Sequence, residues 1–357
     1  MKNVLLFGST GAVGASCLDV LTRRGDVSLV IAGRDEARLR EAASGIQAHV
    51  EIAPLDVADT SAVTAAVTQC DVVINCAGPS RRFSAQVAAV AISAGVPYVD
   101  PGGDDALLDR LAAAGTGVPV VLQAGVQPGV SGLVLRLLAL SRSENIDSVT
   151  VWCGGLQHLT TASVLEYVAS LHDTHSHPGA GLRDGMIQRV SRDECKPAPS
   201  QYFPDSVTVH PHLDAETIAV AAHFDIRNIL WMNVFEGVHT MRAMQLLAVD
   251  DERPRSQAGL SDVLAAAKLD LFGRRPYFSI VGRFGSTTVA FTCPDSYRVT
   301  GAVAACAAQR IAEMPAGIRP FWSIDEPWRT LQCVTEAVPE SEVSLVDDSV
   351  MIEEGSL

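Results

Sequence analysis

A glycine-rich segment near the amino terminus constrains this chain more than any other feature of its sequence. It directly follows the apolar run from Val4 to Phe7 and comprises Gly8, Ser9, Thr10, Gly11, Ala12, Val13 and Gly14. A stretch with helical spacing continues to Arg24. In such a strand–loop–helix unit the first glycine permits a tight turn, the second lets a pyrophosphate approach the backbone, and the third lets helix and strand pack closely. The segment predicts a dinucleotide-binding loop, with a plain structural turn as the alternative.

The first third of the chain alternates between apolar runs and helix-length segments. Strands are expected at residues 4–7, 27–32, 49–53, 71–76, 96–99 and 118–122, and helices at 14–24, 35–43, 59–68, 81–94 and 104–114. The strands lack inside–outside alternation, which is typical of a parallel sheet covered on both faces. Residues 1–125 therefore predict an α/β, doubly wound (Rossmann) dinucleotide-binding domain.

The pattern changes near Gln127-Pro128-Gly129. Residues 126–295 predict a second, α+β domain for substrate binding or dimerisation, with a helix at 131–140 and strands at 149–153, 217–222, 230–235, 277–284 and 287–292. Gly285-Ser286 between the last two strands indicates a hairpin, and hence an antiparallel or mixed sheet. Residues 296–337, with a helix at 300–314, are expected to return to the first domain, and 338–357 to form a loosely packed acidic tail.

The residues that follow the second strand predict which dinucleotide binds. Gly33 and Arg34 come at the strand end, and the guanidinium of Arg34 suits the 2′-phosphate of NADP. Asp35 fits the first turn of the next helix better than the ribose of NAD. NADP is therefore the expected cofactor.

Two later strand ends are expected to complete the cofactor site. Asp56 and Val57 follow the third strand, where Asp56 can reach the adenine or cap the next helix. Ala77, Gly78 and Pro79 follow the fourth strand, at the crevice where the nicotinamide half should lie.

Charge and composition exclude several classes of function. The net charge of −14 leaves no basic footprint for a nucleic acid. No apolar run is long enough to span a membrane, and the first residues lack the features of a leader, so a soluble, cytoplasmic protein is expected. The eight cysteines contain no C-x-x-C pair, which favours reduced thiols.

The glycine spacing is shared with short-chain dehydrogenases, which normally use a Tyr-x-x-x-Lys pair. The chain has only three lysines, Lys2, Lys196 and Lys268, and none has a tyrosine four positions earlier. That chemistry is therefore not available in its usual form.

Several motifs of the first domain resemble, in order and spacing, those of the saccharopine dehydrogenase-like reductases. They are Val4 to Gly8, Ile31 to Arg34, Leu55 to Val57, Asp71 to Asn75, Gly78-Pro79, Ala94 to Asp100, and Gly125 to Ser131. The resemblance covers residues 1 to about 140, with a further similar stretch at 297–301. It implies an NADP- or NAD-binding Rossmann domain joined to a mixed-sheet domain that binds substrate and often dimerises. It also implies hydride transfer linked to a C=N bond, while relatives include reductases of C=C bonds in lipid pathways.

A histidine group in the second domain raises the question of a metal. His172, His175 and His177 are close in sequence, but apart from Asp173, whose side chain should diverge, no acid or cysteine completes them at a familiar spacing. A surface or pocket-lining loop is expected, and no metal.

Two residues at the carboxyl end of the fifth strand are candidates for the chemistry. Asp100 should face the ligand crevice and orient an ammonium or iminium, with helix capping as its alternative role, and Tyr98 should share its face of the strand. The sequence thus predicts an NADP-dependent oxidoreductase that reduces an imine from an amino compound. The alternatives are a C=C reductase of a polyketide or lipid intermediate and a non-catalytic NADP sensor. A small-molecule substrate and a second copy of the chain are the expected partners, with no nucleic acid and no membrane.

Overall fold

The structure is a computed structural model that describes residues 2–25, 27–141, 148–171, 173–249 and 257–347. The chain divides into two compact units. The first unit comprises Met1–Val130 and Tyr297–Val338, and the second comprises Ser131–Ser296 and Pro339–Leu357.

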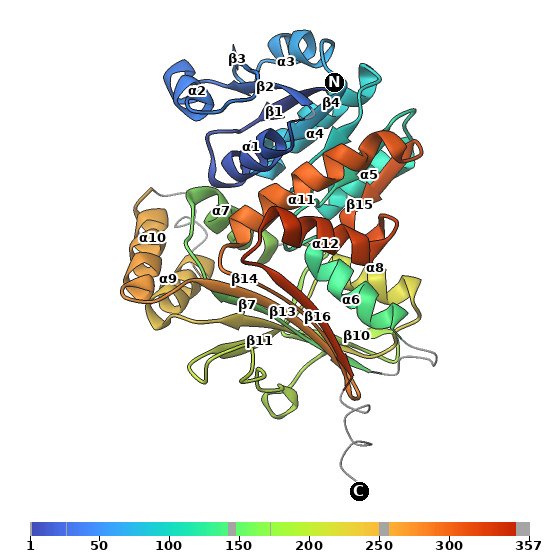
Figure 1. The fold of residues 1–357 in the computed structure, drawn as a ribbon. Coiled ribbons are helices and arrows are strands. Elements are labelled where there is room, and N and C mark those ends of the chain that lie inside the picture. The colour runs from blue at the N-terminus through green and yellow to red at the C-terminus, as the bar shows by residue number, and fades with distance from the viewer. Residues whose placement is uncertain (1, 26, 142–147, 172, 250–256, 348–357) are drawn as a thin grey trace, which may run out of the picture. The chain divides into compact units, whose positions relative to one another are not determined.

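The first unit is built around a seven-stranded sheet in the order β15-β6-β5-β4-β1-β2-β3, in which every pair is parallel. Its strands are β1 (Lys2–Phe7), β2 (Val27–Gly33), β3 (Val50–Pro54), β4 (Val72–Asn75), β5 (Tyr98–Val99), β6 (Pro119–Leu122) and β15 (Gly317–Pro320). The helices are α1 (Ala12–Arg24), α2 (Glu36–Ala43), α3 (Thr60–Val67), α4 (Ser80–Ser93), α5 (Asp105–Ala114), α11 (Ser296–Arg310) and α12 (Pro327–Ala337). From β3 to β6 the order is that of a Rossmann sheet, so the predicted doubly wound fold is confirmed (Figure 1).

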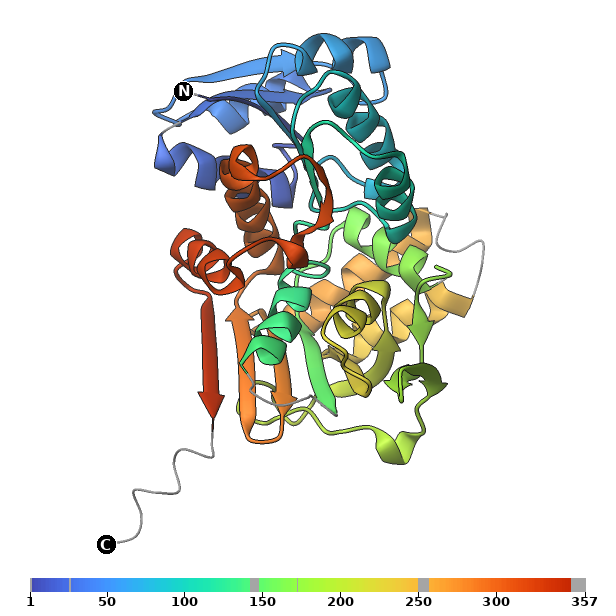
Figure 2. The same cartoon turned by 90° about the vertical axis from the view of Figure 1, so that its right-hand side faces the viewer.

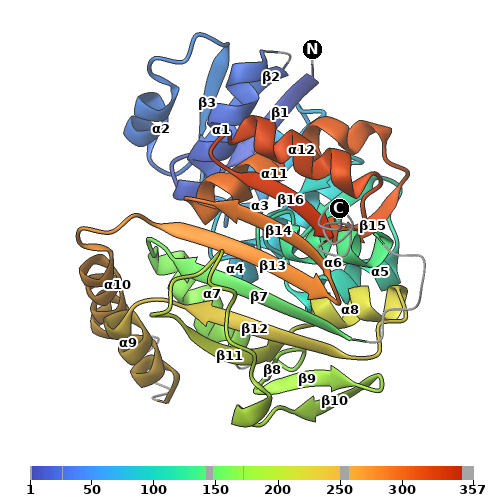
Figure 3. The ribbon, with the colours of Figure 1, turned by 60° about the horizontal axis from the view of Figure 1, so that its bottom comes forward.

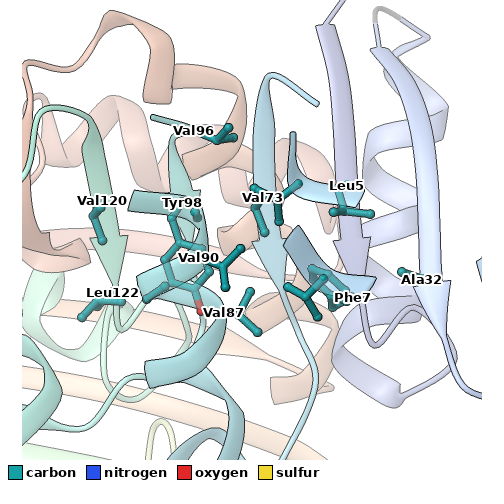
Figure 4. Packing of buried hydrophobic residues seen from close by; sticks show 14 of the residues in the cluster. Leu5, Phe7, Ala32, Val73, Val87, Val90, Val96, Tyr98, Val120 and Leu122 are labelled. Atoms are coloured by element: carbon teal, nitrogen blue, oxygen red, sulfur yellow. The ribbon is translucent and has the colours of Figure 1, made fainter. Parts of the chain in front are cut away.

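Apolar side chains on this sheet explain why the strands lack alternation. The consecutive residues Val4, Leu5, Leu6 and Phe7 of β1 are all buried. Leu5 and Phe7 belong to a core cluster with helix residues such as Val87 (Figure 4). Because helices cover both faces, each strand carries hydrophobic residues in sequence.

The carboxyl-terminal return of the chain packs tightly against the first helix. An ideal Cβ on Gly301 of α11 would lie 2.4 Å from the carbonyl oxygen of Val13, so only glycine allows this approach. The Ser16 hydroxyl donates to the Arg298 carbonyl at 2.8 Å. After α11 the chain adds β15 beside β6, a strand that the sequence did not predict.

The second unit contains a mixed nine-stranded sheet (Figure 3). Its strands are β7 (Val149–Leu156), β8 (His177–Pro178), β9 (Ala180–Arg183), β10 (Met186–Arg189), β11 (Thr208–Leu213), β12 (Ile229–Phe235), β13 (Tyr277–Phe284), β14 (Thr287–Cys293) and β16 (Glu342–Asp347). Its helices are α6 (Val130–Leu140), α7 (Thr161–Leu171), α8 (Ala215–His223), α9 (Val238–Val249) and α10 (Gln257–Leu271). The predicted hairpin is present, with Phe284 paired to Thr287.

One predicted strand of this unit is wrong. Residues 217–222 lie in α8, although Thr217, Ile218 and Val220 favour a strand by their β-branched side chains. The Asp214 carboxylate accepts from the Thr217 N–H at 2.8 Å and caps the helix. The buried positions Glu216, Thr217, Val220 and Ala221 then repeat at helical spacing.

The expected acidic tail differs from the structure in its first part. Glu342–Asp347 forms β16, which pairs antiparallel with β14, as the red strand beside the orange hairpin in Figure 2 shows. An edge strand offers unpaired backbone groups, and this segment supplies their partners. Residues 348–357 lie outside the described part of the chain.

Candidate cofactor site in the first unit

The predicted site residues come together at the carboxyl edge of the parallel sheet. In sheets of this topology the ligand crevice lies outside the carboxyl ends of the strands, where the strand order reverses between β1 and β4. The loops after β1, β2, β3, β4 and β5 therefore supply the candidate site.

The glycines of the first loop divide into two kinds. Gly8 has φ +77°, and its Cβ position lies 2.5 Å from the backbone of Cys76. A Cβ on Gly14 would lie 2.1 Å from the Gly8 carbonyl oxygen. Both positions require glycine for the fold itself.

At Gly11, in contrast, neither the backbone conformation nor the packing requires a glycine. Its φ is −90°, and its Cβ would meet only the Gly8 oxygen, at 3.4 Å. It occupies the N-cap of α1, whose first turn carries no acidic side chain. The backbone there is open to an approaching group at the positive end of a helix, which fits a dinucleotide pyrophosphate.

The other loop residues differ in exposure. Ser9 is buried, and its hydroxyl has no hydrogen-bond partner among the described residues. Thr10 and Val13 are half-buried, and Ala12 is exposed beside Gly11.

Two arginines lie beyond the end of β2, Arg34 directly after the strand and Arg38 in the first turn of α2, of which the sequence pattern indicated only Arg34. Arg34 follows Gly33 and is exposed. Asp35 caps α2 by accepting from the Arg38 N–H at 3.1 Å, as the sequence predicted. Arg38 donates from Nη2 to the Thr10 carbonyl at 3.0 Å, which places its guanidinium on the glycine-rich loop.

Asp56 lies in the loop after β3 and is exposed. Its Oδ1 accepts from the Ala58 N–H at 3.0 Å, forming a local turn. The N-cap of α3 is Asp59, so the capping role considered for Asp56 is wrong. The neighbouring Val57 carbonyl accepts from Gln86 at 3.1 Å.

Asn75, the last residue of β4, hydrogen-bonds to the loop that follows the strand. The Asn75 side-chain oxygen accepts from the Ala77 N–H at 3.2 Å. Gly78 and Pro79 follow, joined by a cis peptide bond, and Gly78 is exposed. These residues lie at the strand end where the nicotinamide half was expected.

Asp100 and Tyr98 are brought together but are not presented to solvent. Asp100 is 1% exposed and Tyr98 is fully buried. The Asp100 carboxylate accepts from the Tyr98 hydroxyl at 2.5 Å, the Asn75 amide at 3.0 Å and the Gly102 N–H at 2.7 Å. Both carboxylate oxygens are thus engaged with neighbouring groups.

Burial governs the titration of this pair. Burial raises the pKa of Asp100, while the hydrogen bonds from Tyr98, Asn75 and Gly102 oppose that rise. Burial and the adjacent Asp100 carboxylate hold the pKa of Tyr98 well above its ordinary value. Its hydroxyl therefore stays protonated and acts as a donor.

The histidine group of the second unit is described in part. The expectation that the Asp173 side chain diverges is wrong, since Asp173 Oδ1 lies 3.1 Å from His175 Nδ1. His177 lies in β8, and His172 falls outside the described residues. Among the described residues, no three His, Cys, Asp or Glu side chains are arranged to hold a metal ion.

Comparison with known proteins identifies relatives of this arrangement. Residues 4–121 match the family described as the saccharopine dehydrogenase NADP binding domain. Over nearly its full length the chain is similar in fold to apo saccharopine dehydrogenase (L-Glu forming) from Saccharomyces cerevisiae, with a TM-score of 0.69, 17% identity, and coverage of 97% of this chain and 100% of that one. The family resemblance, the fold class and the NADP cofactor predicted from the sequence are thereby confirmed.

Two further relatives match shorter stretches. A lipid droplet localized protein of Caenorhabditis elegans is 28% identical over 119 residues, which are 30% of this chain and 28% of that protein. A protein of Mycobacterium tuberculosis described as a candidate trans-acting enoyl reductase is 27% identical over 186 residues, which are 47% of this chain and 44% of that one. The chain thus spans less than half the length of these two relatives.

Proposed function

We propose that this chain, whose residues 4–121 belong to the saccharopine dehydrogenase NADP-binding family and whose fold is that of saccharopine dehydrogenase, is an NADPH-dependent reductase of a polarised double bond. The observation that carries the proposal is Gly11, a glycine at the start of α1 that the backbone does not require and an approaching pyrophosphate does.

The chain's own residues divide the work of binding along the sheet edge. The free N–H groups of α1 receive the pyrophosphate, and Arg34 with Arg38 receives the adenosine 2′-phosphate through charge-assisted bonds. Ala77, Gly78 and Pro79 border the nicotinamide half. When bound, NADPH supplies the hydride.

The buried network has a positioning role in this proposal. Asp100 holds the Asn75 amide, and Asn75 in turn holds the Ala77 N–H. Asp100 also holds the Gly102 N–H, and thus the turn after β5. Through these bonds the network fixes two loops of the crevice, and we assign Asp100 and Tyr98 to that task in place of direct contact with an iminium.

The first substrate class is an imine formed from an amino compound. Its support is the match of residues 4–121 to the family described as the saccharopine dehydrogenase NADP binding domain. Reduction of a protonated imine needs no dedicated acid, which suits a crevice whose acid is buried.

The second substrate class is a C=C bond conjugated to a carbonyl. Its support is the M. tuberculosis relative described as a candidate enoyl reductase. In the third possibility the chain binds NADPH without turning it over. The homodimer, the cytoplasmic location and the domain borders expected from the sequence stay predictions.

One assay separates the three. NADPH oxidation by the purified chain is followed with carbonyl–amino acid mixtures and, in parallel, with α,β-unsaturated acyl thioesters. Turnover with the first set alone supports imine reduction, and turnover with the second alone supports C=C reduction. Tight NADPH binding without turnover in either set would favour the sensor, and absence of NADPH binding would overturn the proposal.

A further inference from the structure

The end of the α9–α10 helix pair exposes apolar side chains to an unusual degree. Phe272, directly after α10, is 86% exposed, and Val238, the first residue of α9, is 79% exposed. Leu269, in the last turn of α10, is 56% exposed. No other large hydrophobic side chain in the described ranges is as exposed as Phe272 or Val238.

These three side chains belong to one patch because the two helices meet there. The Asp270 carboxylate accepts from the Thr240 N–H and hydroxyl, both at 2.7 Å, and from the His239 N–H at 3.3 Å. Asp270, in the last turn of α10, thereby caps the start of α9. Figure 3 shows the two helices side by side. The tip patch, as we name it, comprises Val238, Leu269 and Phe272.

Basic side chains surround the tip patch in a chain whose net charge is −14. They are the exposed residues Arg242, Lys268 and Arg275.

Among the described residues, the acids at this end form no ion pair with these three basic groups. Asp270 is buried as a cap, and Glu236 is buried in an ion pair with a further arginine, Arg274. Helix α9 contains no acidic residue, and the nearest exposed acid on α10, Asp262, lies six positions before Lys268. The surface around the exposed apolar side chains is therefore cationic.

We propose that the tip patch docks the protein on an anionic lipid surface. Protruding apolar side chains among arginine and lysine are the combination that inserts into the headgroup region while the basic groups meet lipid phosphates. A protein partner of ordinary stability needs about 800 Å² of matched shape on each side. A bilayer surface needs no matched shape, so three side chains with a basic border suffice for reversible attachment.

This contact is peripheral and differs from a membrane span. No helix within the described residues is long and apolar enough to cross a bilayer. A hydropathy window averages these side chains with their basic neighbours, so the sequence shows no signal of the tip patch, whose residues are brought together by the pairing of α9 with α10.

Flotation of the full chain with lipid vesicles tests the proposal. Vesicles of phosphatidylcholine alone are compared with vesicles that contain about one third phosphatidylglycerol, at about 50 mM and about 500 mM salt. We expect binding to the anionic vesicles that weakens at high salt. Phe272→Ser should lower the partition coefficient by roughly tenfold, and Lys268→Glu and Arg275→Glu by roughly fivefold or more each.

Matched variants elsewhere provide the control. Trp328→Ser removes an exposed aromatic side chain from α12, and Arg110→Glu reverses an exposed charge on α5. Neither should change vesicle binding, and NADPH affinity should be equal in all five variants. No flotation with anionic vesicles, or equal losses in the control variants, would overturn the proposal. Concentration-dependent self-association abolished by Phe272→Ser would also overturn it, in favour of a second copy as the occupant.

Discussion

Gly11 differs from its neighbours Gly8 and Gly14 in what a side chain would meet. A Cβ on Gly8 or Gly14 would strike the protein's own backbone, whereas one on Gly11 would enter the space in front of α1. This difference separates a glycine needed for folding from a glycine needed for binding. It also makes the two roles accessible to mutation.

We expect Gly11→Val to abolish NADPH binding while the chain still unfolds cooperatively, with a stability loss of no more than about 1 kcal/mol from the changed N-cap. Fluorescence titration with NADPH and thermal unfolding measure the two quantities. The matched variant Gly14→Ala should instead destabilise the fold, because its Cβ would lie 2.1 Å from the Gly8 carbonyl oxygen. Unchanged NADPH affinity in Gly11→Val would contradict the proposed loop.

Arg34 tests the choice of cofactor. Bonds to a charged group contribute roughly 1.5–3 kcal/mol each, so Arg34→Ala should weaken NADPH binding by about 10- to 150-fold and leave NADH binding nearly unchanged. Arg40→Ala is the control, since Arg40 pairs with Glu36 within α2. Equal losses for NADPH and NADH would mean that Arg34 supports the strand end.

Asp100 tests the difference between contact with substrate and positioning. Asp100→Ala leaves the Tyr98 hydroxyl, the Asn75 amide and the Gly102 N–H without their acceptor, and should cost about 1–3 kcal/mol of unfolding free energy. Denaturant unfolding measures this cost, with the exposed Asp109→Ala as control. A normal stability in Asp100→Asn combined with a large loss of turnover and unchanged NADPH affinity would instead place Asp100 against the substrate.

Secondary structure in residues 1–130 follows from local sequence because most of the strands there are short apolar runs bounded by turns. The elements of the second unit are harder to predict from local sequence, as residues 217–222 illustrate. Their β-branched side chains favour a strand, but the Asp214 cap stabilises a helix there. β15 and β16 were missed because each is stabilised by a partner strand distant in sequence.

The candidate site shows the same division. The glycine-rich loop and the Asp35 cap follow from spacing alone. Two other features depend on how α2 and β4 are oriented in the fold. They are the contact of Arg38 with Thr10 and the hydrogen bond of Asn75 to the buried Asp100. Sequence patterns carry no signal for such orientation.

The packing of α11 on α1 links the distant carboxyl-terminal segment to the cofactor loop. Gly301→Ala places a Cβ 2.4 Å from the Val13 carbonyl and 2.6 Å from the Cys17 nitrogen, and overpacking of this kind should cost about 1–3 kcal/mol. We also expect weaker NADPH binding, because α1 must shift. Gly117→Ala is the control, since a Cβ there meets nothing within 4 Å. Thermal unfolding and NADPH titration of the two variants decide the matter.

The first unit is assembled from two separate stretches of chain, Met1–Val130 and Tyr297–Val338. The Val126 N–H donates to the Thr300 hydroxyl at 3.2 Å, so the ends of the two stretches lie close together. We expect residues 1–130 joined to 297–338 by a short flexible linker to fold and bind NADPH, whereas residues 1–130 alone should not unfold cooperatively. Circular dichroism melting and NADPH titration of both fragments test this. A stable, NADPH-binding 1–130 fragment would show that α11 and β15 are dispensable.

The interrupted order of the first unit has a consequence for how the protein is made. A ribosome delivers β1 to β6 early, but it delivers α11 and β15 only after all of residues 131–296 have emerged. Until then the face of α1 around Val13 and Cys17 and the outer edge of β6 are uncovered. The nascent first unit therefore stays incomplete while residues 131–296 are synthesised. A chaperone that binds exposed apolar surface has its longest opportunity to act during that interval.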